Sequence, residues 1–206
     1  MCTIKLNAAQ VAAIYKGGNE EARKALKDSL GEQFSTILPI TERVKTFEDA
    51  VSELGNEHPL VKVYQSIKYG YCSELVGKDL LAYTKLSIIC EALNEGWHPQ
   101  FTLGERRWYP YYELFTNKEI EEMTEEEKSR VVGRASNGAY AYGGLVYSNA
   151  NNVSSYSYTY VGSRLAFKNE ELAEYAGKTF IDIYKDFVMF TSEQVCDAED
   201  NKETIL

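Results

Sequence analysis

Apolar residues recur at helical spacing from the start of the chain to Gly96. Two short runs of this kind follow Asn7 and Asn19, and asparagine is favoured as the residue that caps a helix N-terminus. Glycines follow both runs, as is common where a helix ends. The pattern predicts a helix over residues 8–16 and a second helix over residues 20–30.

Three further helices are expected in the first half of the chain. Thr41 is placed to open a helix over residues 42–54, because apolar side chains recur on one face of that stretch and a glycine follows it. Residues 60–69 form a weaker candidate. Residues 78–94 carry apolar side chains almost all round, and a helix of that kind is expected to be central and well buried.

After Trp97 the pattern turns toward strands. Residues 107–115 are aromatic and β-prone, and Pro110 within them favours a sheet edge or a bulge. Val131-Val132 is a candidate start of a short strand. Residues 160–168 predict a further strand, because their apolar positions alternate.

Helices are expected again in the later part of the chain. Thr124 is followed by three glutamates, which indicates a helix start because acidic residues stabilise the positive end of the helix dipole. Asn169 is placed to cap a helix through about Phe190, whose apolar side chains fall on one face. Residues 193–206 are acidic and are expected to form a flexible tail.

The order of these elements predicts an α+β fold. N-terminal helices come first, followed by a mixed core with a small antiparallel sheet and a C-terminal helix. Pro39 separates the first two, weakly apolar helices from the rest, which suggests a boundary near residue 40. The expected organisation is an N-terminal helical segment over residues 1–39, an α+β ligand-binding domain over residues 40–192, and the tail.

Charge narrows the classes of partner. The net charge is −9 and no undiluted cluster of Lys and Arg appears, whereas nucleic acids and anionic membranes select for such clusters. The start of the chain lacks an apolar signal core, and no apolar run approaches the length that spans a bilayer. We therefore expect a soluble protein made in the cytoplasm without a signal peptide, with no nucleic-acid partner and no membrane insertion.

Few residues suggest catalysis or metal binding. The two histidines, His58 and His98, have no Cys, Asp or Glu at metal-ligand spacing, and the four cysteines form no C-x-x-C pair. Phosphate-binding loops and nucleophile elbows are absent, and the glutamates within residues 119–127 are typical of a solvated helix face. We expect no metal, no cofactor and no catalysis; an enzyme would need a carboxylate such as Glu95 or Glu113 in a cleft.

One segment differs from the rest of the chain. No charged residue occurs between Arg134 and Arg164, although charged residues make up 26% of the sequence. From Tyr147 to Tyr160 nearly every residue is Tyr, Ser or Asn. This is the composition of binding loops, in which Tyr supplies rigid contact area while Ser and Asn supply adaptable hydrogen bonds. A polar linker and a pair of solvent-facing strands are the alternatives, and such strands would still expose a row of tyrosines.

We interpret the segment as an irregular contact surface anchored by tyrosines. Its predicted ligand-binding residues are Tyr140, Tyr142, Tyr147, Ser148, Asn149, Asn151, Asn152, Ser154, Ser155, Tyr156, Ser157, Tyr158 and Tyr160. The scaffold of this site is expected to comprise Trp97, Trp108, Gly162 and Arg164. Arg164 would hydrogen-bond loop carbonyls through its planar guanidinium group.

Several motifs resemble a family of proteins found in gut Bacteroidetes and their phages, over about residues 40 to 190. The similar segments are residues 40–50, 91–97, 107–110, 161–168 and 171–178. The segment rich in Tyr, Ser and Asn, closed by Gly162-Ser163-Arg164-Leu165, is also similar to the end of the variable region in proteins diversified by retroelements.

The second resemblance implies a C-type-lectin-like core whose surface residues vary while the fold is kept. It implies a non-catalytic module that recognises a protein or a surface glycan, in some cases on a phage particle. The Glu-Pro-Asn and Trp-Asn-Asp motifs of calcium-dependent lectins are absent, and the helix after Lys168 is not part of the usual lectin-like ending. The alternative is a structural role, as a phage virion component or a homo-oligomer whose Tyr-rich face is a permanent interface.

Overall fold

The computed structural model of the 206-residue chain describes residues 5–71, 75–100, 102, 104–132, 143–153 and 164–189. The fold is α+β, mostly helical, with a small two-stranded antiparallel sheet. The chain divides into two compact units, Met1–Lys45 and Thr46–Leu206, whereas the sequence suggested a boundary at residues 39 and 40. Among the described residues, no helix has both the length and the apolar character that crossing a bilayer requires.

The first unit is helical and small. Its elements are α1 (Ala8–Gly17), α2 (Glu20–Leu30), the 3-10 turn η1 (Gly31–Gln33), α3 (Phe34–Ile37) and α4 (Ile40–Arg43). Asn7 caps α1 by accepting from the Gln10 N–H, and Asn19 caps α2 in the same way, so both predicted helix starts are confirmed. The rings of Tyr15 and Phe34 pack edge to face at 5.3 Å.

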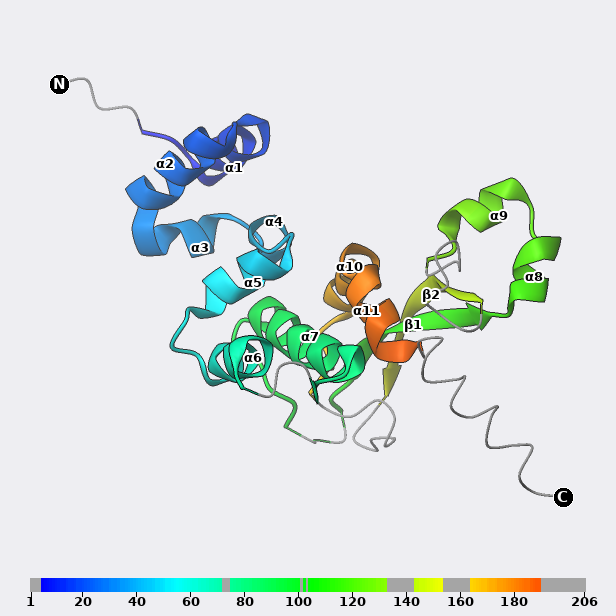
Figure 1. Cartoon of the computed structure of the whole chain (residues 1–206). Helices are drawn as coiled ribbons and strands as arrows, with labels where there is room; N and C mark the ends of the chain where they lie inside the picture. Colours follow the sequence, from blue (N-terminus) through cyan, green and yellow to red (C-terminus); the bar gives the residue numbers. More distant parts are fainter. Residues whose placement is uncertain are drawn as a thin grey trace, which may run out of the picture. The chain divides into compact units, whose positions relative to one another are not determined.

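The second unit contains the other helices and both strands of the part of the chain that the structure describes. Its elements are α5 (Phe47–Leu54), α6 (Pro59–Tyr69), α7 (Lys78–Asn94), β1 (Arg107–Phe115), α8 (Asn117–Glu122), α9 (Glu125–Arg130), β2 (Gly144–Val153), α10 (Glu170–Thr179) and α11 (Ile181–Val188). Helices α5, α6 and α11 pack against α7 (Figure 1). Ile88, Ile89 and Leu93 are fully buried, which confirms the prediction of a central helix over residues 78–94.

Two predicted helices are interrupted in the structure. The helix expected over residues 42–54 is replaced by α4 and α5, because Thr46 and Asp49 form a capping box that starts a new helix. The helix expected from Asn169 to about Phe190 breaks at Phe180, where ψ is 25° and the helical path is interrupted. Thr124 caps α9 as expected, and a matching cap at Thr116 adds α8.

Strands β1 and β2 pair antiparallel over their whole length, from Arg107 opposite Val153 to Phe115 opposite Gly144. The strand predicted over residues 107–115 is therefore confirmed. A bulge between Tyr111 and Tyr112 leaves Ser148 without a direct partner on β1. Strand β2 lies inside the uncharged segment. Residues 144–153 of that segment therefore form a strand with one bulge, and the expectation of an irregular surface was wrong for these residues.

The strand predicted over residues 160–168 is not formed in the part that the structure describes. Arg164 and Leu165 lie in a turn, and Phe167 forms only a single antiparallel bridge with Trp108 of β1. The two bridge hydrogen bonds are 2.7 and 3.0 Å long. The Trp108 N–H thus points away from β2. Backbone groups alternate in direction along a strand, so an N–H at position 110 would point the same way. The missing N–H of Pro110 therefore costs no hydrogen bond between β1 and β2.

Asn94 ties the end of α7 to the chain that precedes α10. Its Nδ2 donates to the Ala166 carbonyl at 2.9 Å, and its Oδ1 accepts from the Lys168 backbone N–H at 3.1 Å. The thiol of Cys90 donates to the same Ala166 carbonyl at 3.1 Å. Asn94 and Cys90 are both buried, so these bonds satisfy backbone groups that water does not reach.

Helix α10 covers one face of the strand pair at Gly177 (Figure 1). A Cβ at this position would lie 2.6 Å from the Tyr147 ring and 2.7 Å from Cβ of Pro110, so only glycine allows the helix to approach so closely. The Tyr112 hydroxyl donates to the Gly177 carbonyl at 2.9 Å. Tyr112, Tyr147 and Pro110 therefore belong to the helix-covered face.

Candidate functional site

The face of the strand pair opposite α10 carries exposed polar and aromatic side chains. Side chains alternate along a strand, so the neighbours of the helix-covered residues point to the other side. We term this set the Tyr111 face; it comprises Tyr109, Tyr111, Glu113, Ser148, Asn149 and Asn151. Tyr111 is 47% exposed and stands directly opposite Asn149.

The polar residues of the Tyr111 face are exposed and partly ordered by one another. Ser148, Asn149, Asn151 and Glu113 are all exposed. The Ser148 hydroxyl, at the bulge, donates to Oε1 of Glu113 at 3.0 Å. Oδ1 of Asn151 accepts from the Asn152 backbone N–H at 2.7 Å. The Asn149 amide and Nδ2 of Asn151 can form hydrogen bonds with a ligand.

An apolar groove of about 240 Å³ adjoins the Tyr111 face at the edge of β1. We term it the Leu114 groove; its lining includes Tyr111, Leu114, Leu165, Tyr184, Phe187 and Val188. Leu114 is 60% exposed, although leucine is usually buried. Pro110 and Tyr112 of the helix-covered face also line the groove, and Leu114 alternates with Tyr111 along β1. The groove therefore lies on the helix-covered side of the β1 edge and meets the polar face at Tyr111.

The predicted contact residues divide into three groups. Ser148, Asn149 and Asn151 lie on the Tyr111 face as described. Tyr147 and Asn152 point to the helix-covered side. The other predicted residues lie outside the described part of the chain: Tyr140, Tyr142, Ser154, Ser155, Tyr156, Ser157, Tyr158, Tyr160 and the scaffold residue Gly162.

Tyr147 is placed as a packing residue, which differs from its expected contact role. Its ring packs against Tyr112 at 5.9 Å, and Nζ of Lys178 lies 5.4 Å from the ring centroid. Burial, followed by the charge of Glu174, raises its pKa. Asn152 is half-buried and accepts from Nη1 of Arg106 at 3.2 Å. Neither side chain therefore contributes to the Tyr111 face.

The sequence missed Tyr111, Glu113 and Leu114 as surface residues. They belong to β1, which the sequence predicted as a strand without assigning its side chains to a face. The alternation of residues 107–115 indicates two faces of a strand. The sequence alone does not show which of the two faces α10 covers.

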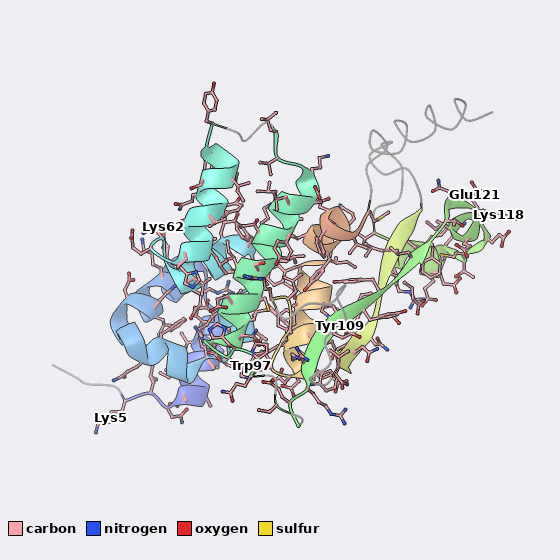
Figure 2. All side chains as sticks on the ribbon, turned by 90° about the horizontal axis from the view of Figure 1, so that it is seen from below. Lys5, Lys62, Trp97, Tyr109, Lys118 and Glu121 are labelled. Carbon is pink, nitrogen blue, oxygen red and sulfur yellow. The ribbon has the colours of Figure 1, made fainter. Side chains whose placement is uncertain are left out.

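The expected scaffold residues Trp97 and Arg164 line a second cavity of about 330 Å³. We term it the Trp97 pocket. Trp97 lies just beyond the C-terminal end of α7 (Figure 2). The label of Tyr109 in the same figure locates β1. Glu95 and Gly96 adopt positive φ values of 49° and 81°, which turn the chain sharply after the helix. Trp108, the other tryptophan, lies in β1 and does not line this pocket.

One face of α7 forms a wall of the Trp97 pocket. Tyr83, Ser87, Glu91 and Asn94 recur at helical spacing and all line it. Nε2 of His98 lies 3.6 Å from Oε1 of Glu91. The Glu91 side chain is 25% exposed, while that of His98 is 68% exposed, so the carboxylate is the more enclosed of the two.

Cys90, Tyr112 and Tyr184 are buried groups with raised pKa values. Burial raises the pKa of the Cys90 thiol, and the negative charge of Glu91 adds to the effect. A thiol that stays protonated is a poor nucleophile. Burial likewise raises the pKa of Tyr112 and of Tyr184. These groups stay neutral and act through packing and hydrogen bonds.

The other carboxylates considered for chemistry are exposed. Glu95 pairs with Lys168 at 3.1 Å, and Glu113 accepts from Ser148; neither lines one of the pockets described above. Glu119 and Glu127 complete capping boxes with Thr116 and Thr124. Within the described ranges, no group of three or more His, Cys, Asp or Glu side chains is placed to hold a metal ion.

Comparisons of the chain with protein-family models, with curated proteins and with solved structures found no match. The chemistry of the two sites is therefore inferred from their own residues.

Proposed function

We propose that the chain is a non-catalytic binding module that contacts a protein partner through the Tyr111 face and the Leu114 groove. The observation that carries the proposal is the exposure of Tyr111 between exposed Asn149 and an apolar groove. Protein interfaces combine a central aromatic or apolar anchor with a polar rim.

The sheet supplies a rigid base for such a surface. One face of it is packed on α10 through Gly177, and Tyr112 is hydrogen-bonded to that helix. A contact surface on a packed strand loses little conformational entropy on binding, because its backbone is already ordered. The Tyr111 side chain adds large contact area with few rotatable bonds.

The chemistry of the surface favours a protein over other partners. The Leu114 groove accepts an apolar side chain, and the asparagine amides and the Ser148 hydroxyl match backbone or side-chain polar groups beside it. The net charge of −9 opposes nucleic acid. A glycan ligand would use the polar residues and leave the apolar groove without a role.

We further propose that the module is of the retroelement-diversified, C-type-lectin-like kind. The support is the uncharged Tyr/Ser/Asn segment closed by Gly162-Ser163-Arg164-Leu165, part of which supplies β2 and three residues of the Tyr111 face. A near-copy of the segment's coding sequence that differs mainly at adenines, next to a reverse transcriptase gene, is expected beside the coding region. Sequencing that region tests this part of the proposal.

The binding role is tested with a displayed library of random peptides selected on the immobilised chain. We expect Tyr111→Ala to weaken the selected peptides by about tenfold or more, as truncation of an interface anchor does. Tyr69→Ala is the matched control, since Tyr69 is 73% exposed on α6 and lies on neither surface. Melting temperatures of both variants should equal that of the parent chain.

Three outcomes would contradict the proposal. The selected peptides could bind Tyr111→Ala as well as the parent chain. Glycans on an array could bind with a dependence on Asn149 and none on Tyr111. Light scattering could show a closed oligomer that dissociates on Tyr111→Ala, which would instead support a permanent interface between copies of the chain.

A further inference from the structure

The Trp97 pocket carries charged and aromatic groups that are not part of the Tyr111 face. Its wall on α7 presents Tyr83, Ser87 and Glu91, each one helical turn from the next. Trp97 and Arg164 line it from segments that follow α7 and precede α10. A cavity of about 330 Å³ with a few placed polar groups has the size and character of a small-molecule site.

Glu91 supplies negative charge inside the pocket. Three quarters of its side chain is shielded from solvent, since 25% is exposed, and a partly buried carboxylate attracts a cation more strongly than an exposed one. His98, 3.6 Å away, lies at the outer rim with 68% of its side chain exposed. The indole of Trp97 adds an electron-rich face, which also favours a bound cation.

Arg164 supplies positive charge to the same pocket. It is exposed, and guanidinium groups bind carboxylates through paired hydrogen bonds. Leu60, Pro99 and Ala166 provide apolar walls. The lining therefore combines one carboxylate with His98 beside it, one guanidinium group and an apolar surface.

We infer that the Trp97 pocket binds a small zwitterion of the α-amino acid class. The ammonium group of the ligand meets Glu91 and the Trp97 ring, its carboxylate meets Arg164, and its side chain lies against the apolar walls. A simple anion would be repelled by Glu91, and a simple cation would be repelled by Arg164. The cavity volume suits a single amino acid. No covalent step is involved.

The inference is tested on the full chain with three compounds that share the isobutyl side chain of leucine. L-leucine carries both charges, 3-methylbutylamine lacks the carboxylate, and 4-methylpentanoate lacks the ammonium group. The readout is the pair of indole N–H signals in a nitrogen-correlated NMR spectrum, because the chain has two tryptophans and only Trp97 lines the pocket. Trp97→Phe and Trp108→Phe assign the two signals.

We expect L-leucine to shift the Trp97 signal at millimolar concentration and to leave the Trp108 signal in place. Each single-charge compound should bind about tenfold more weakly or worse, since each loses one charge-assisted hydrogen-bond contact. Glu91→Gln should weaken L-leucine by about tenfold and remove its advantage over 4-methylpentanoate. Arg164→Gln should remove its advantage over 3-methylbutylamine.

Matched variants test whether the loss of any nearby charge, inside or outside the pocket, weakens binding. Glu95→Gln removes a neighbouring carboxylate that pairs with Lys168 outside the pocket, and Arg130→Gln removes an exposed arginine at the end of α9. Both should bind L-leucine as the parent chain does. Tyr111→Ala should do so too, which separates this site from the proposed protein-binding surface.

The inference is overturned if L-leucine leaves the Trp97 signal unchanged, or if the three compounds bind equally well. It is also overturned if Glu91→Gln and Arg164→Gln, with unchanged melting temperatures, bind all three compounds as the parent does. None of these results bears on the Tyr111 face, whose test uses peptides and a different variant.

Discussion

At the scale of single residues, Asn94 shows how one side chain can require both of its hydrogen-bonding functions. Its amide donates to the Ala166 carbonyl and its oxygen accepts from the Lys168 N–H, with the side chain buried. An acceptor alone cannot replace it, because a carboxylate would face the Ala166 carbonyl with no proton to share.

We therefore expect Asn94→Asp to lower the free energy of unfolding by about 3 kcal/mol, the scale of a buried polar group left unsatisfied beside a charge. Urea unfolding at pH 7 measures it. Asn169→Asp is the control, because the Asn169 side chain only accepts, from the Leu172 N–H, and aspartate keeps that function at the start of α10. Equal losses in the two variants would contradict this account.

Residue patterns predicted four caps correctly and predicted such tertiary bonds poorly. Thr41 was expected to open a helix but lies inside α4, and Thr46 caps α5 instead. Asn7, Asn19, Thr124 and Asn169 all cap helices where their sequence neighbours indicated. A cap bonds to a residue three positions along, so the sequence contains both partners. Asn94 bonds to residues more than seventy positions away, and nothing local to α7 identifies them.

At the scale of elements, α8 and α9 are short helices whose starts depend on paired Thr–Glu caps. Hydrogen bonds from the Thr116 backbone and side chain lower the pKa of Glu119, and the equivalent bonds from Thr124 lower the pKa of Glu127. A lowered pKa in the folded state means that the stabilisation is complete above the ordinary value of 4.5 and is lost as the pH falls through the folded value.

We expect α8 and α9 to lose helicity on acidification below pH 4.5, because protonated glutamates release the cap bonds. Backbone carbon chemical shifts of residues 117–130 follow the change. The variant with Glu119→Gln and Glu127→Gln should lose less helicity than the parent in this window, since its two capping side chains no longer titrate. A parent chain whose shifts stay constant through the same window would contradict the expectation.

The elements that the sequence misplaced each have a physical reason. The apolar face after Asn169 continues without a break through Phe180, so its spacing does not reveal where α10 ends and α11 begins. Strand β2 lacks apolar alternation and is specified by its pairing with β1 across a long connection. The start of α8 was readable, because Thr116 and Glu119 have capping-box spacing.

At the scale of the whole molecule, the second unit contains both candidate sites and the helix that supports them. Helices α5, α6 and α11 pack on α7 within that unit, and Thr46, its first residue, caps α5. The groups that line the Trp97 pocket run from Leu60 to Ala166. Such a site depends on the tertiary fold, so the sequence, which suggested Trp97 and Arg164 as scaffold of the Tyr-rich surface, did not show that they share a separate cavity.

We expect a chain that begins at Thr46 to unfold cooperatively and to keep both sites, because every element that builds them lies beyond that residue. Calorimetry should show a single transition, and the two indole signals should keep their positions. Collapse of the signal dispersion, or loss of peptide binding, would show instead that Met1–Lys45 is needed for the fold of the second unit.

The bond between Asn94 and Ala166 also has a consequence during synthesis. The two residues are 72 positions apart, and ribosomes add about 5–20 residues per second. For several seconds the nascent chain therefore contains all of α7 but not yet Ala166. During this time the Asn94 amide and the Cys90 thiol lack the carbonyl to which they donate in the folded chain. Chaperones that recognise exposed apolar helices would find α7 accessible in that interval, and its protection would begin only when the segment before α10 leaves the ribosome.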